Sequence, residues 1–472
     1  MRAERALAPA DLYSLRFMST TINPIARRGA ITGILWIAGI LACAPSVLMA
    51  QDPVLTASPV ASRSGTVLLG DLYTQVQSAS PRAAAARAVA QAARARVPGA
   101  TRPPDPQVQL GFMNYMLPSL APMPTLGMRQ VQVMQMLPLG GKLAMAGRVA
   151  DARASAASER AQEVTWELRS EIAMSFYDIY ATDRRLEVMR ETVRLLQDIE
   201  KTAASMYRVG DGRQADVLRA QVEIARMVED TVRMQAMRQT MVARLNALLD
   251  RPTDVPIGAP ALPQFPDSIP PRAVLDSIAH GKRPMIRAGL EEVRGAEAAA
   301  ELARKEIWPD LQVGAQYAQR GGEMGGTERM GSLMIGASIP IFARQRQYRM
   351  REETVAMQRM AEADVALMRA DTRGKMGEAY ANLVRARNLS RLYRSTVLPQ
   401  AEATVKSALS AYRVGTVDFM TLLDDQMTVN KYRQELYALD ADQGKAWAEL
   451  EMLSSQVLFD PNKVSAATRA DK

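Results

Sequence analysis

The chain contains one short stretch twice, and this repetition constrains its fold more than any other feature. Tyr207-Arg208-Val209-Gly210 recurs as Tyr412-Arg413-Val414-Gly415, 205 positions further along. Each copy interrupts a long, nearly proline-free segment of helix-forming residues at a glycine, which adopts a left-handed backbone conformation without steric cost. Each copy therefore predicts the tip of a helical hairpin, and the chain is expected to hold two hairpins in tandem.

The segments that flank the tips have the pattern of long helices. Leu143 to Val209 contains no proline and corresponds to about 100 Å of helix at about 1.5 Å per residue. A return helix is predicted over 213–249, and the second half repeats the pattern with helices over 344–414 and 418–456. Pro399 is predicted to kink the third long helix. Apolar residues spaced by three or four form a seam typical of a coiled coil, at Leu186, Met189, Val193, Leu196, Ile199, Ala203 and Met206.

Each half also contains two short segments in which polar and apolar residues alternate, as they do in a strand. The first pair covers residues 107–112 and 129–133. The second pair covers 311–317 and 333–341, with a predicted loop over 320–331. Two strands alone are marginally stable in water, so the four strands are expected to find partners.

Shorter helical regions precede the strands, at 66–97 and 272–304, and each is predicted to break before a proline, at Ser80-Pro81 and Arg283-Pro284. Pro98 is predicted to end the first of them. The whole chain is expected to divide into an N-terminal extension and signal peptide (1–50), a linker (51–65), a first repeat (66–250), a proline-rich linker (251–271), a second repeat (272–456) and a tail (457–472).

The N-terminal region is typical of an exported protein. Translation could start at Met1 or Met18, and Arg27-Arg28 is followed by a 12-residue apolar run that is too short to span a bilayer but fits a signal peptide. Ile40-Leu41-Ala42-Cys43 resembles a lipobox, in which Cys43 would become the lipidated N-terminus. The alternative is cleavage after Ala50, which would discard Cys43, and both routes remain open.

Composition argues against several classes of function. A single histidine, His280, and a single cysteine argue against a histidine-based metal or acid–base site and exclude an intramolecular disulfide. The sequence has no glycine-rich phosphate loop, nucleophile elbow or zinc-protease motif, so no enzyme activity, cofactor or metal site is expected. The net charge is +9, but the arginines alternate with acidic residues, which indicates solvated helix faces and no nucleic-acid partner.

The order, spacing and duplication of these features resemble the TolC-type outer-membrane efflux proteins over about residues 66–456. The motifs that carry the resemblance are Pro104-Asp105 and Pro309-Asp310, Pro138-Leu139-Gly140-Gly141-Lys142, both Tyr-Arg-Val-Gly stretches, and Leu422-Leu423-Asp424 before Gln426. The resemblance implies a mainly α fold with a small β part, formed by duplicated long hairpins and four transmembrane strands. It further implies a homotrimer with a 12-stranded barrel in outer-membrane lipid and a helical barrel in the periplasm.

The resemblance also implies a function, that of the exit duct of a tripartite efflux system. The partners would be a periplasmic adaptor and, through it, an inner-membrane pump of the RND type. The adaptor-contacting tip residues would be Arg208, Val209, Gly210, Arg413, Val414 and Gly415. The channel gate would be formed by Asp424, with Asp425 and Thr421 beside it.

The sequence leaves the transported substrate and the class of function open. Six of the 29 methionines surround the first pair of strands, namely Met113, Met116, Met123, Met128, Met134 and Met136. Thioethers suit Cu(I), which would favour copper or silver export, but methionine also fills gaps in packing. The alternatives are an outer-membrane component of type I protein secretion and an exported coiled-coil scaffold without a channel. Strands in both halves argue against the scaffold, because a coiled coil has no use for them.

Overall fold

The computed structural model describes residues 65–123, 126–321 and 326–464, which belong to one structural unit. The predicted signal peptide, both candidate start positions and Cys43 lie outside the described residues. Within these ranges, no helix is both long enough and apolar enough to cross a membrane.

The helices of the first half agree with the sequence pattern. They are α1 (Leu69–Ala79), α2 (Pro81–Ala100), α3 (Lys142–Val209) and α4 (Gln214–Leu248). The break at Ser80-Pro81 is confirmed, and so is the long helix predicted from Leu143 to Val209, which begins one residue earlier, at Lys142. One boundary is wrong, because α2 continues through Pro98 to Ala100. So close to the end of the helix, the proline removes few backbone hydrogen bonds.

The second half repeats this order. Its helices are α5 (Arg272–Lys282), α6 (Pro284–Lys305), α7 (Gln347–Leu392), α8 (Leu398–Arg413) and α9 (Phe419–Ser454). The predicted disturbance at Pro399 takes the form of a π-helical turn, Tyr393–Val397, between α7 and α8. A wider turn just before a proline accommodates the carbonyl that the ring would otherwise clash with.

The four predicted strands form one antiparallel sheet in the order β1-β4-β5-β6. They are β1 (Gln107–Met113), β4 (Met128–Leu137), β5 (Asp310–Gly321) and β6 (Thr327–Ser338). A small hairpin of β2 (Tyr115–Met116) and β3 (Ala121–Pro122) lies in the loop between β1 and β4. Pairing of β4 with β5 joins the two halves of the chain.

Two strand boundaries differ from the prediction. The loop expected over 320–331 is shorter, because the ladder between β5 and β6 extends to the pair Gly321 and Thr327. Arg320 and Glu328 face each other there and form an ion pair of 2.6 Å, so charged residues that read as loop extend the sheet. At its other end β6 stops at Ser338, before Ile339-Pro340, since proline cannot donate a ladder hydrogen bond.

The main hydrophobic core lies where α3 packs against α9 and where α5 and α7 also pack against α9. The proline-rich segment 251–271 contributes to it, since Leu262 is buried and Phe265 makes aromatic contacts with Tyr177 and Phe459. The segment expected to be a linker is therefore packed against helices of both halves.

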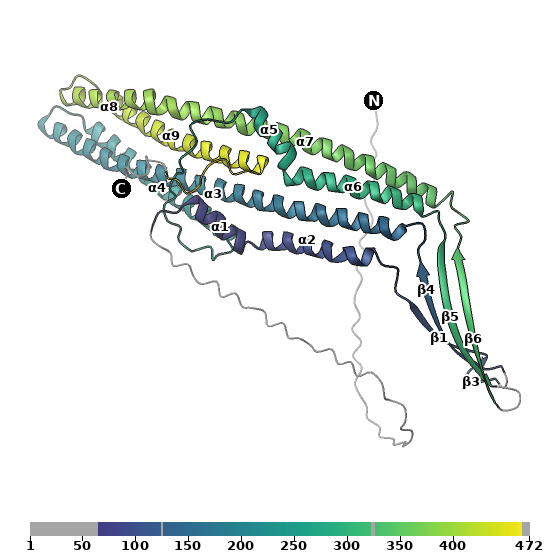
Figure 1. Cartoon of the computed structure of the whole chain (residues 1–472). Coiled ribbons are helices and arrows are strands. Elements are labelled where there is room, and N and C mark those ends of the chain that lie inside the picture. Colours follow the sequence, from purple (N-terminus) through teal and green to yellow (C-terminus); the bar gives the residue numbers. More distant parts are fainter. Residues whose placement is uncertain (1–64, 124–125, 322–325, 465–472) are drawn as a thin grey trace, which may run out of the picture. The chain divides into compact units, whose positions relative to one another are not determined.

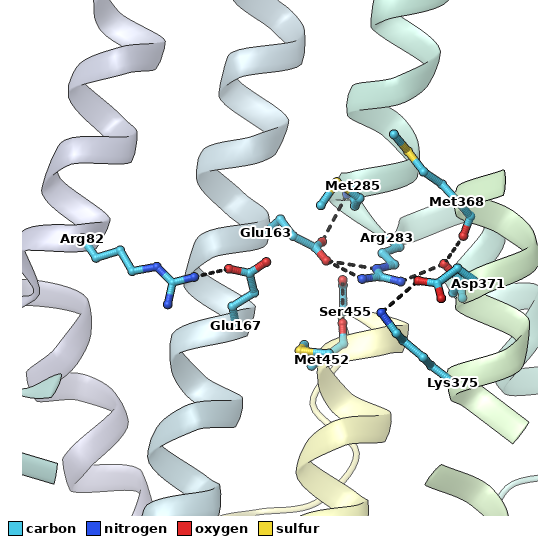
Figure 2. A network of polar contacts seen from close by, with 11 residues as sticks. Arg82, Glu163, Glu167, Arg283, Met285, Met368, Asp371, Lys375, Met452 and Ser455 are labelled. Carbon is cyan, nitrogen blue, oxygen red and sulfur yellow. Dashed lines mark hydrogen bonds and ion pairs between the residues drawn. The ribbon is translucent and has the colours of Figure 1, made fainter. Parts of the chain in front are cut away.

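A buried ion pair joins the halves next to this core (Figure 2). Arg283, at the break between α5 and α6, donates from Nε and Nη2 to Oε1 of Glu163 on α3, at 3.0 and 2.9 Å, and from Nη1 to Oγ1 of Thr372 on α7. The other carboxylate oxygen of Glu163 accepts the backbone N–H of Met285 at 3.1 Å. One buried arginine thus holds three helical segments in register.

Candidate functional site

The two hairpin tips have the same backbone geometry. Gly210 and Gly415 have φ angles of 89° and 72°, in the left-handed region. The N–H of Asp211 donates to the carbonyl of Met206 at 3.0 Å, and the N–H of Thr416 donates to the carbonyl of Ala411 at 3.0 Å. These six-residue closures end a helix at a glycine by a Schellman motif. Both tips lie at the same end of the helices (Figure 1).

The tips present the predicted residues to solvent. Val209 and Val414 are 71% and 72% exposed, among the most exposed large apolar side chains in the described chain. Arg208 and Arg413 are exposed, and neither forms an ion pair within the described residues. An exposed valine beside an unpaired arginine, repeated at both tips, is a surface suited to binding a partner.

Beneath the tips lies a second hydrophobic cluster, the tip core, in which both hairpins meet. Its members are Leu196, Ile199, Ala203, Ala220, Met227, Ala408, Tyr412, Phe419, Leu422 and Leu423. Tyr412 and Phe419 pack edge to face with their ring centroids 5.8 Å apart. Burial, with the nearby carboxylates of Asp216 and Asp418, raises the pKa of the Tyr412 hydroxyl.

The tip core makes the two tips unequal, which the sequence analysis missed. Tyr412 is 5% exposed, whereas its counterpart Tyr207 is 47% exposed. Phe419 covers Tyr412, and the residue 205 positions before Phe419 is Gln214. Aligning the two repeats beyond the Tyr-Arg-Val-Gly stretch would have revealed this aromatic pair in the second hairpin.

The predicted gate residues lie in the first two turns of α9, just after the second tip. Thr421 and Asp424 are exposed and Asp425 is half-buried, whereas Leu422 and Leu423 point into the tip core. Within the described residues, neither aspartate forms an ion pair. The residues equivalent to Asp424 and Asp425 in the first repeat are Arg219 and Ala220, so the acidic surface that these two aspartates form has no counterpart at that position of the first hairpin.

The register of the sheet assigns each strand residue to one of two faces. One face carries aliphatic and aromatic residues, with Leu110 paired to Val131 and Val131 paired to Tyr317. The opposite face carries glutamines, with Gln109 paired to Gln132 and Gln132 paired to Gln316. Most of the large apolar residues of the first face are exposed, and most of the paired glutamines are half-buried. The sheet is therefore two-sided, with an apolar face and a glutamine face.

The Pro-Leu-Gly-Gly-Lys motif forms a junction between the sheet and the helices. Lys142, at the start of α3, is buried and its Nζ lies 2.8 Å from Oδ1 of Asp310 and 3.4 Å from Oε2 of Glu306. Lys305 donates to the carbonyl of Gly140 at 2.9 Å. The motif of the first repeat is thus fixed to the strand start of the second repeat, a pairing of distant residues that sequence reasoning had no means to find.

No group of three or more histidine, cysteine or acidic side chains able to hold a metal ion exists in the described parts of the chain. The described ion pairs lie within single helices, between helices, within the sheet at Arg320 and Glu328, or at the junction of sheet and helices.

Comparison with solved structures shows the same fold. The outer-membrane channel OprN has a TM-score of 0.67 at 18% identity, with 82% of this chain and 90% of that chain covered. CusC gives 0.71 at 16% identity, covering 83% and 92%. The outer membrane protein VceC of Vibrio cholerae gives 0.70 at 15% identity, covering 83% and 97%. Comparison with curated protein sequences gave no match.

The family profile described as "Outer membrane efflux protein" matches residues 72–251 and 276–455, once in each repeat. The match confirms the resemblance, the mainly helical fold with a four-stranded antiparallel sheet, and the outer-membrane location with a periplasmic helical region. The chain belongs to the outer membrane efflux protein family, whose members form the non-enzymatic, trimeric outer-membrane channels of tripartite efflux systems.

Proposed function

We propose that this chain is the passive exit duct of a tripartite efflux system, which receives substrates from an inner-membrane RND-type pump through a periplasmic adaptor. The duplicated tips carry this proposal most directly. Arg208 with Val209, and Arg413 with Val414, are exposed on two copies of one turn, so an adaptor with repeated binding elements would meet the same arginine and valine pair at each tip. Gly210 and Gly415 hold both surfaces in the same conformation.

Assembly into a homotrimer is supported by the internal repeat. Met145 and Ala152 on α3 are buried, and an added Cβ at Gly295 of α6 would lie 3.4 Å from the Cβ of Ala152. Their counterparts 205 positions later, Met350 and Met357 on α7, are exposed. The helix that would cover them by the same geometry is α2 of a second copy. The contact of α7 with α2 of the next chain would thus repeat the contact of α3 with α6 within one chain.

The two-sided sheet supports a shared barrel. Strands β1 and β6 form its two edges, and unpaired edges are unsuited to a lipid environment. Three chains would contribute four strands each, with β6 of one chain beside β1 of the next. The apolar face, which carries Leu110, Phe112, Leu333 and Ile335, would contact lipid, and the glutamine face would line the lumen.

The acidic surface after the second tip is proposed as the gate. Three copies of Asp424, with Asp425 and Thr421 beside each, would gather around the axis of the trimer. Like charges crowded at a constriction attract counter-ions, so the closed channel would prefer cations. Single-channel recording in a planar bilayer tests this, with the mass of the detergent-solubilised assembly measured in parallel.

The expected result is a trimer with small, cation-preferring conductance that increases in Asp424→Ala. Asp254→Ala is the matched control, because Asp254 is an exposed aspartate in the segment between the repeats. The conductance of this variant should equal that of the wild type. Val209→Glu and Val414→Glu should abolish efflux in cells that hold the cognate pump and adaptor, while the purified channel conducts normally. A water-soluble species without conductance would refute the duct.

A further inference from the structure

The methionines of the four-stranded sheet all lie on one face. The register places Met113, Met128, Met134, Met136, Met330 and Met334 on the glutamine face. Within the described strands, the apolar face carries none, although it contains the valines, leucines and isoleucine of the sheet. If methionine served only as apolar filler, it would be expected on the apolar face as well.

Two of these methionines converge across the central strand β5. Met134 of β4 and Met334 of β6 both pair with Gly314. A Cβ built on Gly314 would lie 3.2 Å from Cγ of Met134 and 3.6 Å from Cε of Met334. The glycine therefore leaves the space between the two strands to the thioether side chains. Both methionines are half-buried, so they remain accessible from the glutamine face.

The side chains next to this pair are uncharged. The residue pairs next along the same face are Met136 with Gln312 and Gln132 with Gln316. Thioether sulfur prefers Cu(I) and Ag(I) over hard divalent ions, and amide side chains do not compete for soft metals. Among the described residues of this face, no histidine, cysteine or carboxylate lies next to Met134 and Met334. The pair would therefore favour soft monovalent ions over Zn²⁺ or Ca²⁺.

We propose that Met134 and Met334 form a binding site for a soft monovalent cation, Cu(I) or Ag(I), and that the remaining methionines of the glutamine face continue it as a thioether path. Binding itself requires only the sheet described above. The role of the path in transport rests on the proposed duct, in which this face lines the lumen. The class of substrate that such a path would conduct is soft metal cations.

The test is titration of the purified full-length protein in detergent with Ag(I), in chloride-free buffer. All variants carry Cys43→Ser, because a thiolate would bind Ag(I) in place of the thioethers. The double variant Met134→Leu with Met334→Leu keeps side-chain volume and removes sulfur. The matched control is Met234→Leu with Met237→Leu on α4, away from the sheet.

The expected result is that the sheet variant binds Ag(I) at least about tenfold more weakly than the wild type, a loss that even outer-shell changes produce at metal sites. The α4 variant should bind like the wild type, and both should keep the native assembly mass and potassium conductance. Equal Ag(I) affinity in the sheet variant would overturn the proposal and assign the two methionines to packing. A protein that binds Ag(I) at this site without conducting would refute the duct and leave the site intact.

Discussion

Substitution of Gly415 by alanine is predicted to destabilise the second tip through backbone strain alone. The residue has a φ of 72°, and no heavy atom lies within 4 Å of the position that a Cβ would occupy. No steric clash with neighbouring atoms contributes, so the cost is that of an L-residue in the left-handed region, about 1–2 kcal/mol. Gly210, with a φ of 89° and equally open surroundings, should behave in the same way.

The same substitution should have the opposite sign at Gly374. This glycine lies within α7, and a Cβ there would also meet no atom within 4 Å. Alanine in a helix interior is more stable than glycine by about 0.5–1 kcal/mol, because glycine loses more backbone entropy. Gly374→Ala is therefore a control that holds the chemical change constant and varies only the backbone conformation.

Amide hydrogen exchange at the tip measures the effect locally. The N–H of residue 415 donates to the carbonyl of Tyr412, and that of Thr416 donates to the carbonyl of Ala411, each at 3.0 Å. A loss of 1–2 kcal/mol corresponds to exchange that is about 5–30-fold faster at these amides. The reasoning is refuted if Gly415→Ala leaves the exchange unchanged, or if Gly374→Ala accelerates exchange along α7.

Two further predictions concern the buried ionisable groups. Glu163→Gln should destabilise the protein by about 3–5 kcal/mol in denaturant titrations, because it leaves Arg283 buried beside an uncharged amide. The control Glu229→Gln removes an exposed partner of Arg233 and should lower the free energy of unfolding by only about 0–1 kcal/mol. Equal losses of stability in the two variants would contradict the argument. Burial raises the pKa of Glu451, so the folded state holds its proton more tightly than the unfolded state, and stability should fall as pH rises above the ordinary glutamate pKa. Glu451→Gln keeps an acceptor for the N–H of Leu458, and its stability should decrease less with rising pH than that of the wild type. Denaturation midpoints of both proteins, measured from about pH 4 to about pH 7, test this. Parallel pH profiles of the two proteins would exclude Glu451 as the cause.

The sequence by itself determined the elements and their duplication. Helix and strand periodicities are local, so the long helix α3, the breaks at Ser80-Pro81 and Arg283-Pro284, and the four strands could be predicted without tertiary contacts. The tips could be placed because glycine is the residue that the left-handed turn requires, and both Gly210 and Gly415 adopt it.

Only the tertiary structure decided what depends on pairing between distant segments. Pairing of β4 and β6 with β5 sets which residues of different strands lie side by side. The alternation within each strand therefore could not show that Met134 and Met334 both pair with Gly314. The ion pair of Lys142 and Asp310 spans 168 positions. Local patterns carry no record of such contacts, because they depend on how the second repeat packs against the first.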